Sequence, residues 1–259
     1  MFVKRRHAAL LTLTILSGAA YFCGTSAFAD RLVLWKIVHE QCWPHAEAGQ
    51  TPPKPCDEVE LGGGEAKGDA VLKDLRGIAQ LLLIPAARVT GIEDPLVLAD
   101  DAPNYFAAGW RARADMARYL KMSPPREAIG VAINSQFARS QDQLHLHVDC
   151  LRPEVATTLA DYAPHFDGQW RPMTVDLHGR KYWARRVDGP DLDGVFPFRL
   201  LADEMPGASG EMAHWSLAAA AIDFQGKPGF VLLADHAGLE GGGHAEDLQD
   251  HDCRLALGR

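Results

Sequence analysis

The sequence predicts an α+β fold in which an antiparallel sheet is covered by helices. Three observations lead to this prediction. Short apolar runs separated by turn residues indicate strands that pair as hairpins. A longer segment with apolar residues at helical spacing indicates a helix that lies on the sheet. The composition, 47% hydrophobic and 23% charged over 259 residues, is that of an ordinary globular chain, long enough for one large domain or two small ones.

The first 29 residues differ in character from the rest and are left out of the fold prediction. Basic residues at positions 4–6 precede an apolar run, Ala8–Phe22, and small residues follow up to Ala29. This order is typical of an export signal. The uncharged stretch also approaches the roughly 20 residues that a membrane-spanning helix requires. We therefore expect 1–29 to be either a cleaved signal peptide or a retained N-terminal membrane anchor, and 30–259 to form the folded domain.

The first part of the folded domain is predicted to contain a helix, a hairpin, a longer helix and two further strands. Apolar spacing indicates the first helix, and the Pro- and Gly-rich stretch 52–68 is expected to contain only turns. Two short apolar runs on either side of Arg76-Gly77 indicate the hairpin. Pro103 and Asn104 open the longer helix, whose broad apolar face should lie across the sheet. In order, the predicted elements are helix Leu32–Glu40, strands Ala70–Lys73 and Gln80–Pro85, helix Asn104–Leu120, and strands Ile129–Asn134 and Gln143–Cys150.

The second part is predicted to contain two helices and three strands. Periodicity and turn residues again separate these elements. They are helix Pro153–Ala163, strand Lys181–Val187, helix Pro197–Met205, and a hairpin of strands His214–Phe224 and Gly229–Ala234. This order resembles that of the first part and suggests a pseudo-duplicated second half, although residue identities show no internal repeat.

Four cysteines remain behind the export segment: Cys42, Cys56, Cys150 and Cys253. An even number of cysteines in a chain that leaves the reducing cytoplasm indicates disulfides. Three pairings are possible. The short, proline-rich loop between the first two cysteines favours Cys42–Cys56, which leaves Cys150–Cys253. A zinc site is the alternative, but no CxxC or HxxxH spacing supports it.

The predicted strand Gln143–Cys150 presents two histidines on one face. Side chains alternate along a strand, so His145 and His147 point the same way, while the apolar residues between them pack on the helix. Ser140 and Asn134 are close in sequence and add neutral donors and acceptors. The histidine face is therefore predicted to line a cleft, where one imidazole attacks phosphorus or takes a proton and the other donates a hydrogen bond to a phosphoryl oxygen.

A histidine pair of this spacing has other uses. Two histidines on a strand also serve as metal ligands or are simply exposed. The alternative of another class is therefore a periplasmic metal- or nucleotide-binding protein that uses both imidazoles without turnover.

The motif Gln143-Leu144-His145-Leu146-His147-Val148 resembles the histidine triad of the HIT superfamily of nucleotide hydrolases and transferases, with glutamine in the first position. More closely, the chain resembles the bacterial CDP-diacylglycerol pyrophosphatase family over nearly the whole mature chain. The matching segments are Lys36–Val38 with Cys42, Pro55-Cys56, Val71–Leu75, Ala132–Ser135, Arg139–Gln141, Cys150–Pro153, Ala184–Val187, and Asp250-His251 before Cys253.

The resemblance implies that 30–259 is a HIT-like catalytic domain that hydrolyses CDP-diacylglycerol to CMP and phosphatidate through a covalent nucleotidyl-histidine, without a metal or other cofactor. His145 would be the nucleophile. The other implied roles are binding of phosphoryl oxygens or support of the leaving group by His147, Ser140 and Gln143, a nucleotide or phosphate contact by Asn134, and a ribose contact by Asp74. Arg139 is the cation nearest the motif and is expected to offset the diphosphate charge. Gln143 cannot titrate, so it can act only by hydrogen bonding.

The resemblance also indicates the partners and the location. The expected partners are the lipid-linked nucleotide and the inner membrane surface, either on its periplasmic side or in the periplasm after signal cleavage. The alternative substrate is a soluble nucleoside diphosphate derivative, for which the same residues would serve. A formal net charge of -8 argues against nucleic acid as a partner. The sequence gives no oligomeric state.

Overall fold

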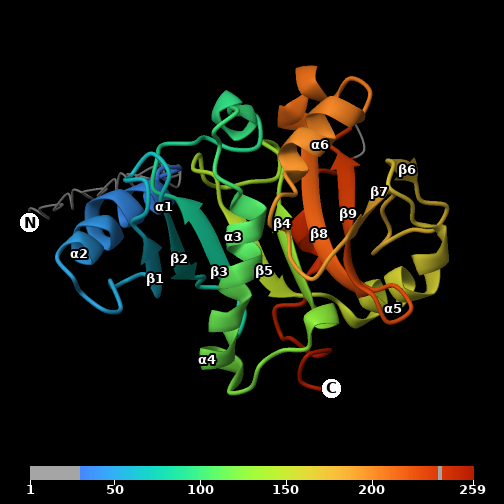
Figure 1. The fold of residues 1–259 in the computed structure, drawn as a ribbon, viewed down its shortest axis with the longest axis horizontal. Coiled ribbons are helices and arrows are strands. Elements are labelled where there is room, and N and C mark those ends of the chain that lie inside the picture. The colour runs from blue at the N-terminus through green and yellow to red at the C-terminus, as the bar shows by residue number, and fades with distance from the viewer. Residues whose placement is uncertain (1–29, 239–240) are drawn as a thin grey trace, which may run out of the picture.

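The computed structural model describes residues 30–238 and 241–259, and these form one nine-stranded antiparallel sheet with helices on both faces (Figure 1). The predicted α+β fold with an antiparallel sheet is confirmed. The strands are β1 Glu58–Glu60, β2 Asp69–Lys73, β3 Leu81–Pro85, β4 Ile129–Ile133, β5 Leu146–Cys150, β6 Arg171–Pro172, β7 Trp183–Asp188, β8 Trp215–Asp223 and β9 Pro228–His236. The main helices are α1 Val33–Ile37, α2 Trp43–Glu47, α3 Tyr105–Ala112, α4 Met116–Leu120, α5 Pro153–Tyr162 and α6 Pro197–Glu204.

The strand order repeats between the two halves of the sheet. Across the sheet it is β1-β2-β3-β5-β4-β8-β9-β7-β6, so β2-β3-β5-β4 from one side has the same connectivity as β6-β7-β9-β8 from the other. In both halves a helix, α3 or α6, precedes the last two strands. The third strands of the two halves, β4 and β8, meet at the centre, where Ala132 pairs with Ala218. The second half thus repeats the element order of the first, as the sequence suggested.

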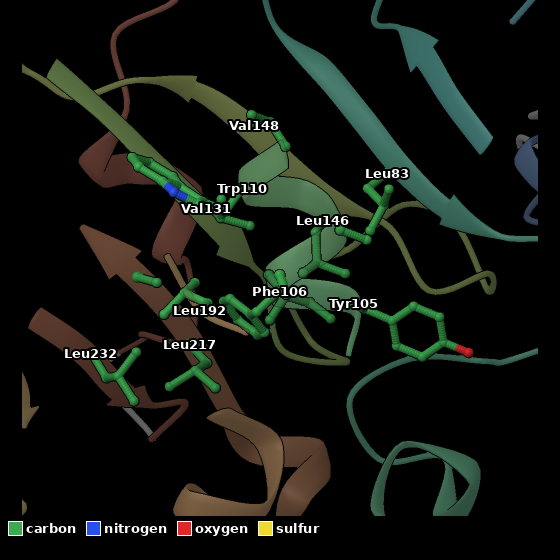
Figure 2. Close-up of a cluster of buried hydrophobic side chains, with 14 of the residues drawn as sticks. Leu83, Tyr105, Phe106, Trp110, Val131, Leu146, Val148, Leu192, Leu217 and Leu232 are labelled. Carbon is green, nitrogen blue, oxygen red and sulfur yellow. The ribbon is translucent and has the colours of Figure 1, made fainter. Parts of the chain in front are cut away.

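One face of the sheet is covered by α3, α4 and α6, which bury the larger apolar core. Leu146 and Val148 of β5 belong to this core, as the alternation predicted (Figure 2). Gly109 of α3 lies close to the sheet, because an added Cβ would lie only 3.0 Å from Val131 Cγ1 and 3.5 Å from Val148 Cγ2. The predicted packing of the longer helix across the strands is therefore present.

The opposite face is covered in two separate places. On one side, α1 and α2 pack on β2 and β3 around Leu72 and Leu82. On the other side, α5 and the 3-10 turn Ala245–Leu248 pack on β8 and β9. His147 of β5 pairs with Leu82 of the first cluster and Ala132 of the second, so it lies between them. This part of the sheet is where a site can form.

Several element boundaries differ from the prediction. The strand predicted from Gln143 begins only at Leu146, because the Leu144 N–H donates to the Val89 carbonyl (2.6 Å) outside the ladder. The helix predicted to end at Glu40 runs on as a π-helical turn, Val38–Cys42, into α2, where Pro44 occupies the first turn and needs no N–H partner. The helix predicted over 104–120 is divided into α3 and α4 by a 3-10 turn, 113–115.

Two short edge strands were not predicted. β1 lies in the stretch expected to contain only turns, and β6 has two residues. Both pair with a single neighbour, so each is defined by the strand beside it rather than by its own apolar pattern.

Both predicted disulfides are confirmed. Cys42–Cys56 joins the N-terminal helical segment to the chain two residues before β1, and Cys150–Cys253 ties the C-terminal segment to the end of β5. The second bridge closes a sequence separation of 103 residues. Two disulfides indicate an extracytoplasmic location. The expected signal or anchor, 1–29, lies outside the described residues, and within the described part no helix is long and apolar enough to cross a membrane.

Candidate active site

A cavity of about 510 Å³ opens on the uncovered part of the sheet, between α1, the β2–β3 turn and the loop that leads into β5. Most of the residues predicted to act together line it. They are Asp74, Asn134, Arg139, Ser140, His145 and His147, joined by the unpredicted Glu246. Gln143 is the exception, since it is fully buried behind this wall.

His145 lies directly before β5 and is held in one orientation by its own chain. Its Nδ1 is 2.7 Å from the Gln143 carbonyl oxygen. A carbonyl only accepts, so Nδ1 carries the proton and Nε2 keeps a free lone pair. Burial and the neighbouring His147 lower the pKa of His145 to about 4. The ring is therefore neutral near pH 7, with a nucleophilic nitrogen available.

His147 has the opposite tautomer, set by Gln80. The Gln80 Nε2 amide lies 3.1 Å from Glu246 Oε1 and 3.0 Å from His147 Nδ1. A carboxylate only accepts, so the amide donates one hydrogen to Glu246 and the other to Nδ1. His147 Nδ1 also lies 3.4 Å from Glu246 Oε1, but no hydrogen bond joins them, so the Gln80 amide is the partner of Nδ1 and the proton of neutral His147 is assigned to Nε2. Burial lowers the pKa of His147, which keeps the ring neutral.

The Nε2 atom of His147 is buried and has no hydrogen-bond partner among the described residues. An unsatisfied buried donor costs about 1–3 kcal/mol, so such an atom in a cavity wall fits a ligand acceptor. The centroids of the His145 and His147 rings are 5.0 Å apart. The pair thus offers one lone pair and one N–H to the same small volume, which suits attack on phosphorus with support of a phosphoryl oxygen.

Glu246 is the central residue that the sequence analysis missed. Its carboxylate accepts hydrogen bonds from Gln80 and from Asn134 Nδ2 (3.0 Å), and its backbone N–H donates to Asn134 Oδ1 (3.0 Å). Burial alone would raise the pKa of Glu246, but the amide donors of Gln80 and Asn134, together with His251, hold it below its ordinary value. The group is therefore a carboxylate that orients the amides behind His147.

A histidine–aspartate pair, His251 with Asp149, lies beside this carboxylate. His251 Nδ1 lies 2.8 Å from Asp149 Oδ2, and His251 Nε2 lies 3.8 Å from Glu246 Oε1. The hydrogen bond with Asp149 raises the pKa of His251. Asp149 thus shares the histidine face of β5 and connects it to half-exposed His251.

The remaining predicted residues are held as follows. Gln143 donates its amide to the Pro85 (2.9 Å) and Ala87 (2.8 Å) carbonyls, so contact with a phosphoryl oxygen would require one of these bonds to be exchanged. Arg139 forms a bidentate pair with Glu93 (2.6 and 2.7 Å), and its charge is largely compensated within the protein. Ser140 is exposed in the cavity wall.

Metal-ligand geometry occurs in one place among the described residues. Asp149 groups with Cys150 and Cys253, but the two sulfur atoms are bonded to each other and are not free to bind a metal. His145 and His147 have no third close ligand within the described ranges.

The missed residues lie about 100 positions downstream of the histidine strand in a segment without a motif. A signal for them was present in the predicted Cys150–Cys253 pairing. That bridge brings the C-terminal segment to the end of β5, and Asp250-His251 stands just before the second cysteine.

The second half of the sheet has no equivalent pair of imidazoles. Ala132 and Ala218 pair at the centre of the sheet and are equivalent in the two halves. Ala132 pairs with His147 of β5, and Ala218 pairs with Leu233 of β9, so Leu233 is the equivalent of His147. Val231, two positions before Leu233, is in the same way the equivalent of His145, which comes two positions before His147. Both apolar residues are buried under α5.

Comparisons with known proteins agree with this geometry. Residues 29–257 match the family described as CDP-diacylglycerol pyrophosphatase. A CDP-diacylglycerol pyrophosphatase of Yersinia pestis is 42% identical over 255 residues, which are 98% of this chain and 96% of the relative. The matched range includes the whole cavity, both disulfides and the C-terminal segment with Glu246 and His251.

Proposed function

Because the chain belongs to the CDP-diacylglycerol pyrophosphatase family, we propose that its cavity hydrolyses CDP-diacylglycerol to CMP and phosphatidate by way of a nucleotide bound covalently to His145. The chain is an enzyme that hydrolyses CDP-diacylglycerol. One observation supports the histidine route above all others. The two imidazoles have opposite tautomers, so a free lone pair and an unpartnered N–H face the same cavity.

In the first step the Nε2 lone pair of His145 attacks the phosphorus on the cytidine side. The bond from that phosphorus to the bridging oxygen breaks, and phosphatidate leaves with the electron pair. A phosphate monoester has a second pKa of about 6, so it leaves without a strong acid. The positive charge that develops on the ring is stabilised by the Nδ1–H bond to the Gln143 carbonyl.

In the second step water attacks the same phosphorus and the N–P bond breaks. CMP leaves, the proton from water is released to solvent, and His145 returns to its neutral form. In both steps the His147 Nε2–H donates to a phosphoryl oxygen, where negative charge accumulates. Catalysis then depends on positioned donors, which is usual for phosphoryl-type transfer.

The other cavity residues are assigned supporting contacts. We expect the Ser140 hydroxyl to donate to a phosphoryl oxygen and Asp74 to accept from ribose hydroxyls. Asn134 uses its remaining amide hydrogen toward the nucleotide while it holds Glu246. Arg139 has four of its five N–H groups engaged by carboxylates, so its contact with the diphosphate is limited to the fifth. Gln143 steadies the site loop and presents its carbonyl.

The location follows from the substrate and the disulfides. We propose that the folded domain, 30–259, works at the periplasmic side of the inner membrane, because its substrate is a lipid-linked nucleotide and its disulfides suit an oxidising compartment. Residues 1–29 then serve as the export segment, cleaved or retained. A soluble nucleoside diphosphate derivative would use the same residues. Measuring kcat/KM for both substrates with one preparation shows which of the two the enzyme prefers.

The test is release of CMP from CDP-diacylglycerol in detergent with excess chelator. His145→Ala should lower kcat by a factor on the order of 10⁴, whereas His165→Ala, an exposed histidine outside the cavity, should leave it unchanged. Quenching with alkali should trap a labelled nucleotide on the protein, because an N–P bond survives alkali and breaks in acid. Full activity of His145→Ala, or activity that disappears with chelator, would contradict the proposal.

A further inference from the structure

The mouth of the cavity carries apolar side chains that face solvent. Leu75, at the tip of the β2–β3 turn, is 103% exposed, Ile78 in the same turn is 45% exposed, and Val33 of α1 is 40% exposed. Leu75 and Val33 line the cavity itself. Exposed large apolar groups that cluster around one opening mark a contact surface rather than random surface composition.

The turn that presents Leu75 is held firmly. Lys73 Nζ donates to the carbonyl oxygens of Asp74 (2.6 Å), Arg76 (3.2 Å) and Gly77 (3.0 Å). Asp74 Oδ1 accepts the Arg76 N–H (3.1 Å), which closes the turn from the other side. The leucine is therefore held outward by internal bonds and does not fold back onto the protein.

The cavity lining is divided by chemistry. One wall is polar and contains the histidine pair, Glu246 and Ser140. The apolar wall near α1 consists of Val33, Leu34, Ile37, Pro55, Leu72 and Leu82, and the β2–β3 turn beside it adds Leu75 together with the charged Lys73, Asp74 and Arg76. A substrate with a nucleotide at one end and acyl chains at the other matches this division.

The path of the chain gives a second, independent indication. Asp30 and Leu34 are bonded to Gln141 of the site loop, and Arg31 pairs with Asp142 (2.7 Å), so the chain enters the fold beside the mouth. The apolar run Ala8–Phe22 precedes it in sequence.

We propose that the mouth-side surface, defined as Val33, Leu75 and Ile78, rests in the lipid surface of the membrane and that the apolar wall receives the diacylglycerol end of the substrate. The inference builds on the proposed function and adds the face by which the enzyme meets its substrate. CDP-diacylglycerol then enters from the bilayer with its diphosphate passing the turn toward the histidines. Its acyl end need not leave the lipid phase.

The test compares two substrates with the full chain reconstituted in phosphatidylcholine vesicles. One substrate is long-chain CDP-diacylglycerol in the same vesicles, and the other is CDP-dihexanoylglycerol dissolved below its micelle concentration. The double variant Leu75→Ser with Ile78→Ser should lower kcat/KM on the vesicle substrate at least about tenfold, because less apolar area enters the lipid. Its kcat/KM on the dissolved substrate should fall by a clearly smaller factor, because Leu75 also lines the cavity but this substrate does not have to leave the lipid.

The matched control removes two other exposed apolar side chains, by Leu96→Ser with Met122→Ser. These residues are 50% and 44% exposed and flank the elements that cover the opposite face of the sheet. The control should behave as wild type on both substrates. An unchanged vesicle rate in the turn variant, an equal loss on both substrates, or an equal loss in the control would each overturn the inference. If wild type hydrolysed neither substrate, the proposed function itself would fail, which is a separate outcome.

Discussion

Hydrolysis should continue well below neutral pH, because the attacking imidazole is hard to protonate. Burial and the adjacent His147 bring the pKa of His145 to about 4, against 6.5 for an ordinary histidine. At pH 5.5 about 97% of such a ring is neutral, compared with about 9% of an ordinary imidazole. The rate at pH 5.5 should therefore remain close to the rate at pH 7, about tenfold above that expected from an unperturbed nucleophile.

The assay is kcat/KM for release of CMP from dissolved CDP-dihexanoylglycerol between pH 3.5 and 8, at constant ionic strength and with chelator. This parameter reports the essential groups of the free enzyme. The groups that face the ring are His147, whose pKa is also lowered, Glu246, whose pKa lies below its ordinary value, and permanently charged Arg139. A single inflection at about 6.5 would refute the assignment of a buried, neutral His145 as nucleophile.

The same pKa has a consequence for stability. Between pH 6.5 and about 4 the unfolded chain binds a proton at His145 that the folded chain does not, so stability falls as pH falls through this window. The full effect is about 3 kcal/mol. In wild type, the free energy of unfolding measured by urea titration should therefore fall between pH 6.5 and 4. In His145→Asn this fall should be smaller by about 3 kcal/mol, because the titrating ring is gone. An unchanged pH dependence in this variant would contradict the shift.

Three further predictions concern the surroundings of the site. Glu246→Gln should lower kcat about 10- to 100-fold with an unchanged melting temperature, because the amides lose the acceptor that orients them behind His147. The control Glu211→Gln should have no effect on kcat. A wild-type rate for Glu246→Gln would contradict this role. Cys253→Ser should lower the free energy of unfolding by roughly 4 to 5 kcal/mol, more than opening the shorter bridge, and an unchanged stability under reduction would argue against it. Leu233 is fully buried in β9, so Leu233→Ala should lower the free energy of unfolding by about 2–5 kcal/mol. At temperatures where the variant is folded, its kcat should be unchanged. A specific loss of turnover would show that the second half takes part in the chemistry.

The sequence was most informative where the residue pattern and the fold have the same period. Alternation on β5 gave the correct faces for Leu146 and Val148, and the cysteine spacing gave both bridges. The start of β5 was wrong, because tertiary hydrogen bonds to the loop after β3 remove Gln143 and Leu144 from the ladder. Such bonds leave no periodic trace in the sequence.

The partners of the histidines were beyond the reach of local patterns. Gln80 and Glu246 are separated by 166 positions and meet only because the sheet and the C-terminal bridge bring them together. The expected engagement of Arg139 with the diphosphate also overlooked Glu93, which is distant in sequence and takes most of the guanidinium. Charge alone does not reveal whether a cation is already compensated.

The repeated strand order gives the sheet a pseudo-twofold topology, but equivalent positions in the two halves carry different side chains. One half of the sheet carries the two imidazoles. At the equivalent positions the other half carries Val231 and Leu233, which pack in an apolar cluster. On the proposed route such a chain forms at most one covalent nucleotide per molecule, so a pre-steady-state burst of phosphatidate, the first product, should approach one per chain and never two.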